Sequence, residues 1–274
     1  MENLNTKVEK HYLQEGLYEN IIHRLREMDI DLKNVRRQDL SPVDEFHIRG
    51  AAVSKELASS IDLKSLEVLD VGCGIGGPCR MLAEEFNCQA TGIDLNSEFI
   101  RTATKLSELL SLGSKTKFVQ GDALNLPFED NSFDIVWTQH VQMNIADKKR
   151  FYSEIFRVLR KGGYFLFYDI LKKGDGEVTY PMPWANDSSI SFLLKAAEKQ
   201  SLLKELGFTK IQTIDQTSAG IDFLHEMFEK LAELGPPKLG LNVVMGETTK
   251  PKLLNLFNHL KSEKLELRSG VFRK

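Results

Sequence analysis

The stretch Leu66-Glu-Val-Leu-Asp-Val-Gly-Cys-Gly-Ile-Gly-Gly77 decides the fold of this chain, because it joins a buried strand to a glycine-rich turn. Its apolar residues predict a parallel β-strand over residues 66–71. Glycines after such a strand let the backbone turn tightly and approach a ligand closely. Residues 78–86 then predict a helix whose N-terminus points at the same ligand. The stretch therefore predicts a nucleotide-binding turn.

Two carboxylates decide which nucleotide suits this turn. Gly72, Gly74 and Gly77 fit a dinucleotide pattern, and Asp94 follows at about the expected distance. Asp70, however, lies at the strand end, where a carboxylate is unfavourable beside a doubly negative pyrophosphate. The ammonium group of S-adenosylmethionine (SAM) would favour Asp70, and the ribose diol of SAM suits Asp94. Capping of the turn is the alternative role for Asp70.

With these residues the chain resembles the class I SAM-dependent methyltransferases over roughly residues 64–170. The acid–glycine motif Asp70-Val-Gly-Cys-Gly-Ile-Gly76 and the second-strand acid Asp94 are followed in the family's order by Gly121-Asp-Ala123 and by the fourth strand. The resemblance implies an enzyme that uses SAM and releases S-adenosylhomocysteine. It implies cofactor binding by Asp70, Gly72, Gly74, Gly76, Asp94, Leu95, Asp122, Ala123 and Gln139.

Strands and helices alternate from residue 64 onward, which predicts an α/β fold with a doubly wound sheet. The predicted strands are residues 66–71, 89–94, 116–120, 133–138, 163–170, 209–216 and 265–273. The predicted core helices are residues 78–86, 97–110, 147–160 and 190–206. By resemblance, the last of seven strands inserts antiparallel, which gives the order 3-2-1-4-5-7-6.

The remaining segments predict helical additions to a single methyltransferase domain of residues 1–274. Within that domain we expect two lid helices, at about 220–234 and 249–260. The additions and the loop 171–189 should gather over the strand ends as a lid. The parts of the domain are a helical N-terminal cap at 1–63, a Rossmann-like core at 64–217, a helical lid insertion at 218–262 and the last strand at 263–274.

The polar segment after the fourth strand, residues 137–144, is the best candidate for catalysis. Methyl transfer from a sulfonium needs an in-line approach, and it needs a general base only when the acceptor arrives protonated. His140 is the candidate base, since an imidazole titrates near neutrality. Gln139 would face the acceptor beside it. A packing role at the lid interface is the alternative for His140.

Further polar and aromatic side chains are candidates for binding the acceptor. Gln142 and Asn144 would orient its polar atoms, and Arg49, with its neighbour His47, would bind a carboxylate. A surface ion pair is the alternative role for Arg49. Trp184 and two N-terminal tyrosines would present aromatic faces to a methylated ammonium, unless they only pack. These tyrosines are Tyr12 and Tyr18.

The segments 44–47, 138–144 and 180–185 look like a bacterial branch that is similar to the sarcosine and dimethylglycine N-methyltransferases. The resemblance implies N-methylation of a small amine. An apolar, roomy lid would instead favour C- or O-methylation of a quinone or another secondary metabolite. A non-catalytic SAM sensor is an alternative from another class, whereas Asp70 and the antiparallel last strand speak against an NAD-dependent dehydrogenase.

Composition and the lack of certain motifs argue against several classes of binding partner. A net charge of −3 and the absence of an Asn/Asp-Pro-Pro-aromatic signature argue against a nucleic-acid substrate. No apolar run is long enough to cross a membrane, and the N-terminus lacks a signal-peptide core. Cys73, Cys79 and Cys88 fit no metal spacing. We expect a cytoplasmic monomer or homodimer that binds a small-molecule acceptor and no metal, nucleic acid or membrane.

Overall fold

The computed structural model describes residues 3–274 and contains a seven-stranded mixed sheet of order β3-β2-β1-β4-β5-β7-β6. Strands β1 to β5 run parallel, and β7 is antiparallel to both β5 and β6. The predicted fold and strand order are thus confirmed. The strands are β1 (Glu67–Val71), β2 (Gln89–Asp94), β3 (Thr116–Gln120), β4 (Phe133–Gln139), β5 (Leu159–Lys172), β6 (Thr209–Asp215) and β7 (Leu265–Arg273).

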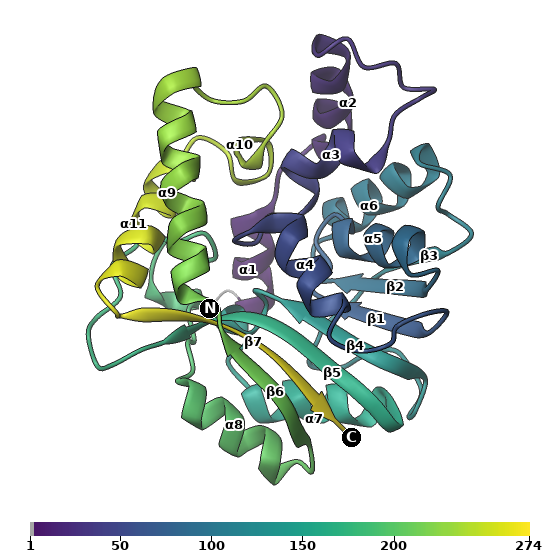
Figure 1. Cartoon of the computed structure of the whole chain (residues 1–274), viewed down its shortest axis with the longest axis vertical. Helices are drawn as coiled ribbons and strands as arrows, with labels where there is room; N and C mark the ends of the chain where they lie inside the picture. The colour runs from purple at the N-terminus through teal and green to yellow at the C-terminus, as the bar shows by residue number, and fades with distance from the viewer. Residues whose placement is uncertain (1–2) are drawn as a thin grey trace.

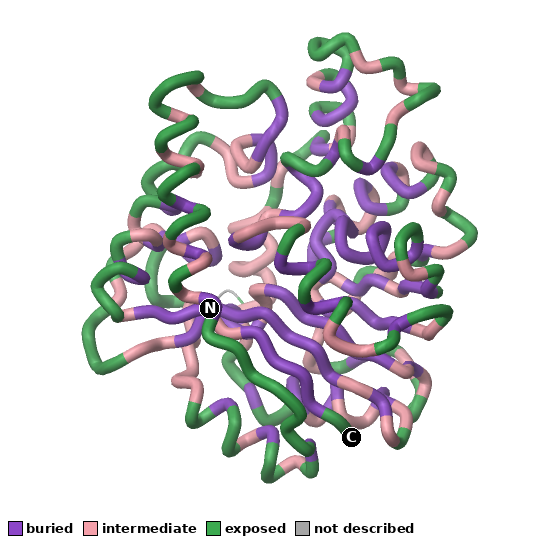
Figure 2. Tube along the Cα trace, viewed as in Figure 1, coloured by how far each residue is buried: buried purple, intermediate pink, exposed green. Residues whose placement is uncertain are grey.

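The central strands are buried on both faces, as a covered parallel sheet requires. Adjacent residues of β1 point to opposite faces, so Val68 packs with Trp137 on one side and Leu69 packs with Phe165 on the other. Figure 2 shows the buried centre and the exposed edge strand β6. The sheet is therefore a rigid platform whose central strand ends can position a site.

Helices cover both faces of the sheet, with α7 and α8 below it and α4, α5 and α6 above it in Figure 1. The predicted helix at 190–206 starts later, because Ser188–Ile190 forms a separate 3-10 turn and Glu198 caps the backbone amide of Lys195. The core helices are α5 (Gly77–Glu85), α6 (Ser97–Leu109), α7 (Lys148–Val158) and α8 (Ala196–Glu205).

The N-terminal cap is helical, although the first two residues of the predicted range lie outside the described residues. A buried ion pair between Asp44 and Arg80 ties the cap to α5. A Cβ atom at Gly77 would lie 2.1 Å from the Asp44 carbonyl oxygen, so only glycine permits this approach. The cap helices are α1 (Leu4–Tyr12), α2 (Leu17–Glu27), α3 (Arg37–Asp44) and α4 (Gly50–Ala58).

The insertion between β6 and β7 contains α9 (Thr217–Leu234), α11 (Thr249–Lys261) and a short helix that the sequence did not predict, α10 (Leu241–Met245). Helix α10 packs against α2 and α3 of the cap, while α9 and α11 pack against each other and against β7. Cap and insertion thus meet at one end of the sheet (Figure 1). None of the helices within residues 3–274 combines the length and the apolar character that a membrane crossing needs.

Candidate active site

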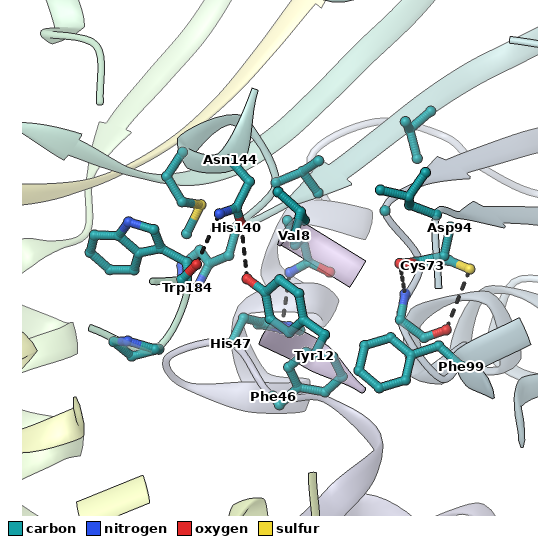
Figure 3. A pocket seen from close by; sticks show the side chains of 18 of the residues that line it. Val8, Tyr12, Phe46, His47, Cys73, Asp94, Phe99, His140, Asn144 and Trp184 are labelled. Atoms are coloured by element: carbon teal, nitrogen blue, oxygen red, sulfur yellow. Dashed lines mark hydrogen bonds between the residues drawn. The ribbon is translucent and has the colours of Figure 1, made fainter. Parts of the chain in front are cut away.

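A cavity lies at the carboxyl ends of β1, β2 and β4, under the cap and the insertion. Figure 3 shows Asp94 and Cys73 at one side of it, Trp184 and Asn144 at the other, and Tyr12 between them. The two sides differ in origin. Strand ends and the glycine turn form the first, whereas the loop after β5 and the lid helices form most of the second.

The glycine turn forms one wall of the cavity in a backbone conformation that other residues rarely adopt. Gly72 and Gly74 have φ angles of 76° and 53°. A Cβ atom at Gly72 would lie 2.4 Å from a methyl group of Val141, and one at Gly74 would lie 2.7 Å from the ring of Phe46. Glycine is therefore needed for both conformation and space.

Asp94 is held by the backbone of the same turn. Its two carboxylate oxygens accept hydrogen bonds from the backbone amides of Gly74 and Asn96, each at 2.9 Å. Burial raises the pKa of Asp94, and the three backbone hydrogen bonds to it oppose that shift. A fixed carboxylate of this kind can accept hydrogen bonds from the two hydroxyls of a ribose.

Asp70 and Asp122 lie on the same side of the cavity. Burial raises the pKa of Asp70 to about 7, and its carboxylate accepts a hydrogen bond from the Cys79 thiol, with the sulfur 3.6 Å away. Asp122 accepts a 2.8 Å hydrogen bond from the side-chain amide of Asn5 in α1. Helix α1 therefore covers the part of the site to which Asp122 belongs.

The structure brings nearly all predicted cofactor residues to this cavity. Gly76 is not among the described lining residues; it is the N-cap of α5 with a φ of 83°, where a Cβ atom would lie 2.5 Å from the Phe118 ring. The cofactor candidates that line the cavity are Asp70, Gly72, Gly74, Asp94, Leu95, Asp122, Ala123 and Gln139.

Most polar side chains after β4 are already bonded within the protein. The Gln139 amide oxygen accepts from the Trp137 indole at 2.8 Å, and its nitrogen donates to Ser54 Oγ at 3.1 Å. Asn144 donates to two backbone carbonyls and accepts from the Tyr12 hydroxyl at 2.9 Å. Gln142 lies outside the described lining and donates to the Ile170 carbonyl. These residues shape the site, and their polar side-chain atoms are already hydrogen-bonded within the protein.

His140 differs from its neighbours. It lines the cavity, and its buried Nε2 atom has no hydrogen-bond partner among the described residues. Its φ of 53° is unusual for a residue with a side chain, and such strain is concentrated at functional sites. Burial, together with the neighbouring His47, lowers the pKa of His140 well below its ordinary value. Burial therefore favours the neutral form of the His140 ring.

Trp184 lines the cavity with its indole nitrogen bonded to Ser191, but the structure does not bring Arg49 or Tyr18 there. Arg49 lies outside because its guanidinium pairs with Glu56 and with the Gln216 side chain. Tyr18 lies outside because it belongs to the first turn of the next helix, where the ammonium of Lys105 lies 4.8 Å from its ring centre. Tyr12, at the end of α1, lines the cavity in its place.

The sequence did not single out several residues that line the cavity. Helix α1 contributes one face, and the spacing of its apolar residues by four was the available signal. The insertion contributes only apolar residues, which no motif distinguishes from core. The lining residues missed in this way are Leu4, Asn5, Val8, Phe223, Leu224, Met227, Leu241, Val244, Met245, Leu253 and Leu256.

The strand ends and the glycine turn fall within residues 69–167, which match the family model of a methyltransferase domain. This chain contains a methyltransferase domain. The domain match begins inside β1 and ends inside β5, so it includes the turn, Asp94, Asp122 and His140. The cap and the lid insertion lie outside it.

Similar proteins agree on the methyltransferase domain and differ in their acceptors. A sterol 24-C-methyltransferase of Gibberella zeae is 41% identical over 116 residues, which cover 42% of this chain and 30% of that protein. A SAM complex of Haemonchus contortus phosphoethanolamine N-methyltransferase 2 has a TM-score of 0.77 at 17% identity, covering all of this chain and 60% of that one. A candidate sarcosine dimethylglycine methyltransferase of Galdieria sulphuraria has a TM-score of 0.66 at 18% identity, covering 94% and 98%.

The alignments span between 30% and 44% of the first sterol methyltransferases, so this chain matches less than half of each. The solved structures, all below 25% identity, show the fold. Together the family model, the sterol methyltransferase relatives and the fold support a methyltransferase domain in this chain.

Proposed function

We propose that this chain transfers a methyl group from SAM to a carbon or oxygen atom of a small, largely apolar acceptor. The observation that carries the proposal is the lining of the acceptor side. Every residue that the insertion contributes there is apolar, and no lysine or arginine lines the cavity among the described residues. An apolar acceptor would remove this surface from water, and burial of apolar surface contributes a favourable free energy of roughly 25 cal/mol per Å².

The cofactor side fits SAM in this proposal. Asp70 would face the ammonium, Asp94 the ribose hydroxyls and Asp122 the adenine amino group, while the glycine turn leaves room for the backbone to approach. When bound, SAM supplies a methyl group on a positively charged sulfur. The acidic side chains around the cavity, with no cation among its described lining residues, suit that charge.

His140 would accept the proton that the acceptor loses. Burial favours its neutral form, its buried Nε2 atom has no hydrogen-bond partner among the described residues, and general-base catalysis by a positioned imidazole contributes on the order of 10²–10⁴-fold. Gln139 and Asn144 would have a structural role around it, because their side chains are already hydrogen-bonded to other residues of the protein.

N-methylation of sarcosine or dimethylglycine has less support. Such acceptors carry a carboxylate, and burying one without a cationic partner is costly. Arg49, the expected partner, is engaged outside the cavity with Glu56. The likeness to the candidate Galdieria sulphuraria enzyme lies at 18% identity and concerns the fold.

The test is a transfer assay with methyl-labelled SAM and four acceptors: a sterol, a prenylated quinol, sarcosine and dimethylglycine. We expect label in an apolar acceptor, a loss of about a hundredfold in kcat for His140→Ala, and unchanged SAM affinity by calorimetry. His225→Ala on the exposed face of α9 is the matched control. Label only in sarcosine or dimethylglycine would refute the apolar acceptor, and absence of SAM binding would refute the methyltransferase itself.

A further inference from the structure

A second group of titratable side chains lies beside His140, and the function proposed above does not use it. Glu45, His47 and Ser54, from the α3–α4 segment, meet Gln139 at the end of β4, and all four are buried. The Ser54 hydroxyl donates to Glu45 Oε2 at 2.5 Å. His47 Nε2 lies 3.4 Å from the same oxygen and 3.0 Å from Ser54 Oγ.

The partners of His47 Nε2 suit either protonation state. Because the Trp137 indole can only donate, its bond fixes the Gln139 oxygen and leaves the Gln139 nitrogen, a donor, 3.0 Å from His47 Nε2. The Gly50 carbonyl, which can only accept, lies 3.1 Å from the same nitrogen. A bare Nε2 therefore accepts from Gln139, and a protonated one donates to Gly50 or Glu45.

The two imidazoles differ in their charged neighbours. Their ring centres are 6.0 Å apart, in an edge-on arrangement. Burial lowers the pKa of His140, and no carboxylate contacts its ring among the described contacts. Burial raises the pKa of Glu45, but hydrogen bonds and charge from His47, with the Ser54 bond, outweigh it and leave that pKa below its ordinary value. Glu45 is thus ionised beside His47.

We propose that the Glu45–His47 pair holds the proton that the acceptor loses during methylation; this inference rests on the function proposed above. The electron pair of the acceptor's X–H bond forms the new bond to the methyl carbon, and the carbon–sulfur pair goes to sulfur. The proton passes to His140 Nε2 and then, through a water molecule, to His47, where the Glu45 carboxylate balances the charge. Glu45 and His47 act through His140 and are positioning residues.

Other charged or titratable groups surround the pair, and the test must separate their effects from that of Glu45. They come from α3, the β1 end, the β4 end and β5. These groups are Arg37, Asp44, Asp70, His140 and Tyr168.

The first measurement follows the ring nitrogens of ¹⁵N-histidine-labelled protein by NMR between pH 5 and 9 with S-adenosylhomocysteine present. His47→Gln assigns the signal. We expect Glu45→Gln to lower the titration midpoint of His47, because the neighbouring negative charge is lost, and Glu45→Asp to restore most of it. Glu56→Gln, a half-exposed acid of the same segment, is the matched control. An unmoved midpoint in Glu45→Gln overturns the proposal.

The second measurement is turnover with whichever of the four acceptors accepts label. We expect Glu45→Gln to lower kcat about tenfold and to shift the acidic limb of its pH profile to lower pH, with SAM affinity unchanged. A lower kcat with an unshifted acidic limb of the pH profile means that the Glu45–His47 pair has only a structural role in the cavity wall. A selective loss of SAM affinity assigns Glu45 to the cofactor. Either result overturns the proton role and leaves the methyltransferase proposal, which SAM binding and label transfer test separately.

Discussion

The two halves of the cavity are built in opposite ways. On the cofactor half, acids at the strand ends are fixed by nearby backbone: Asp94 accepts from Gly74 and Asn96, and Asp122 accepts from Leu124. On the acceptor half, the lining comes from helices separated by most of the chain, and those of the insertion contribute only apolar side chains. The difference teaches that the two halves suit different ligands. Short polar motifs suit a cofactor that the family shares, whereas an apolar enclosure selects an acceptor by its shape.

Helix α1 joins the two halves. Its first turn places Asn5 against Asp122, and its last residue, Tyr12, donates to Asn144. Asn144 in turn donates to the backbone carbonyls of Trp184 and Ile190 in the acceptor half. The position of α1 against Asp122 therefore also fixes one wall of the acceptor half.

The largest expected effect breaks the cofactor half alone. Asp94→Ala removes the carboxylate that fixes the Gly74 and Asn96 amides and that would accept from the ribose. Hydrogen bonds to a charged group contribute about 1.5–3 kcal/mol, so SAM should bind about a hundredfold more weakly by calorimetry. Asp175→Ala, at an acid whose side chain is 93% exposed, is the control. Unchanged SAM affinity in Asp94→Ala would refute the assignment of this half.

A smaller effect should break the acceptor half while sparing the cofactor half. Met227→Lys places an ammonium in the apolar lining from a partly exposed position of α9, so folding should survive. Partial burial of a charge costs about 2 kcal/mol, which corresponds to about a thirtyfold loss of kcat/KM for an apolar acceptor. His225→Lys adds a similar charge on the exposed side of the same helix. Equal losses in both variants would mean that α9 does not contact the acceptor.

The contrast between the cofactor half and the acceptor half also explains which features the sequence predicted correctly. The strand order and most of the cofactor candidates followed from the family resemblance, which rests on short motifs of glycines and acids. Arg49 and Tyr18 were placed at the site by residue type alone, and their partners Glu56, Gln216 and Lys105 were not visible in any motif. The short helix α10 and the apolar lining have the composition of ordinary core, so only packing of distant segments reveals them.

The smallest expected effect concerns the cofactor half and tests the charge of the Asp70 carboxylate rather than its presence. Burial raises the pKa of Asp70 to about 7, and a ligand ammonium would favour its ionised form. As pH falls through this value, the free protein gains a proton that it must release before binding. Affinity for S-adenosylhomocysteine should therefore fall about tenfold between pH 7.5 and 6, since a tenfold change corresponds to about 1.4 kcal/mol. Adenosine, which lacks the ammonium, should bind with little pH dependence over this range, and Asp70→Asn should flatten the profile of S-adenosylhomocysteine. A profile that stays steep in Asp70→Asn would assign the titration to another group of the cavity.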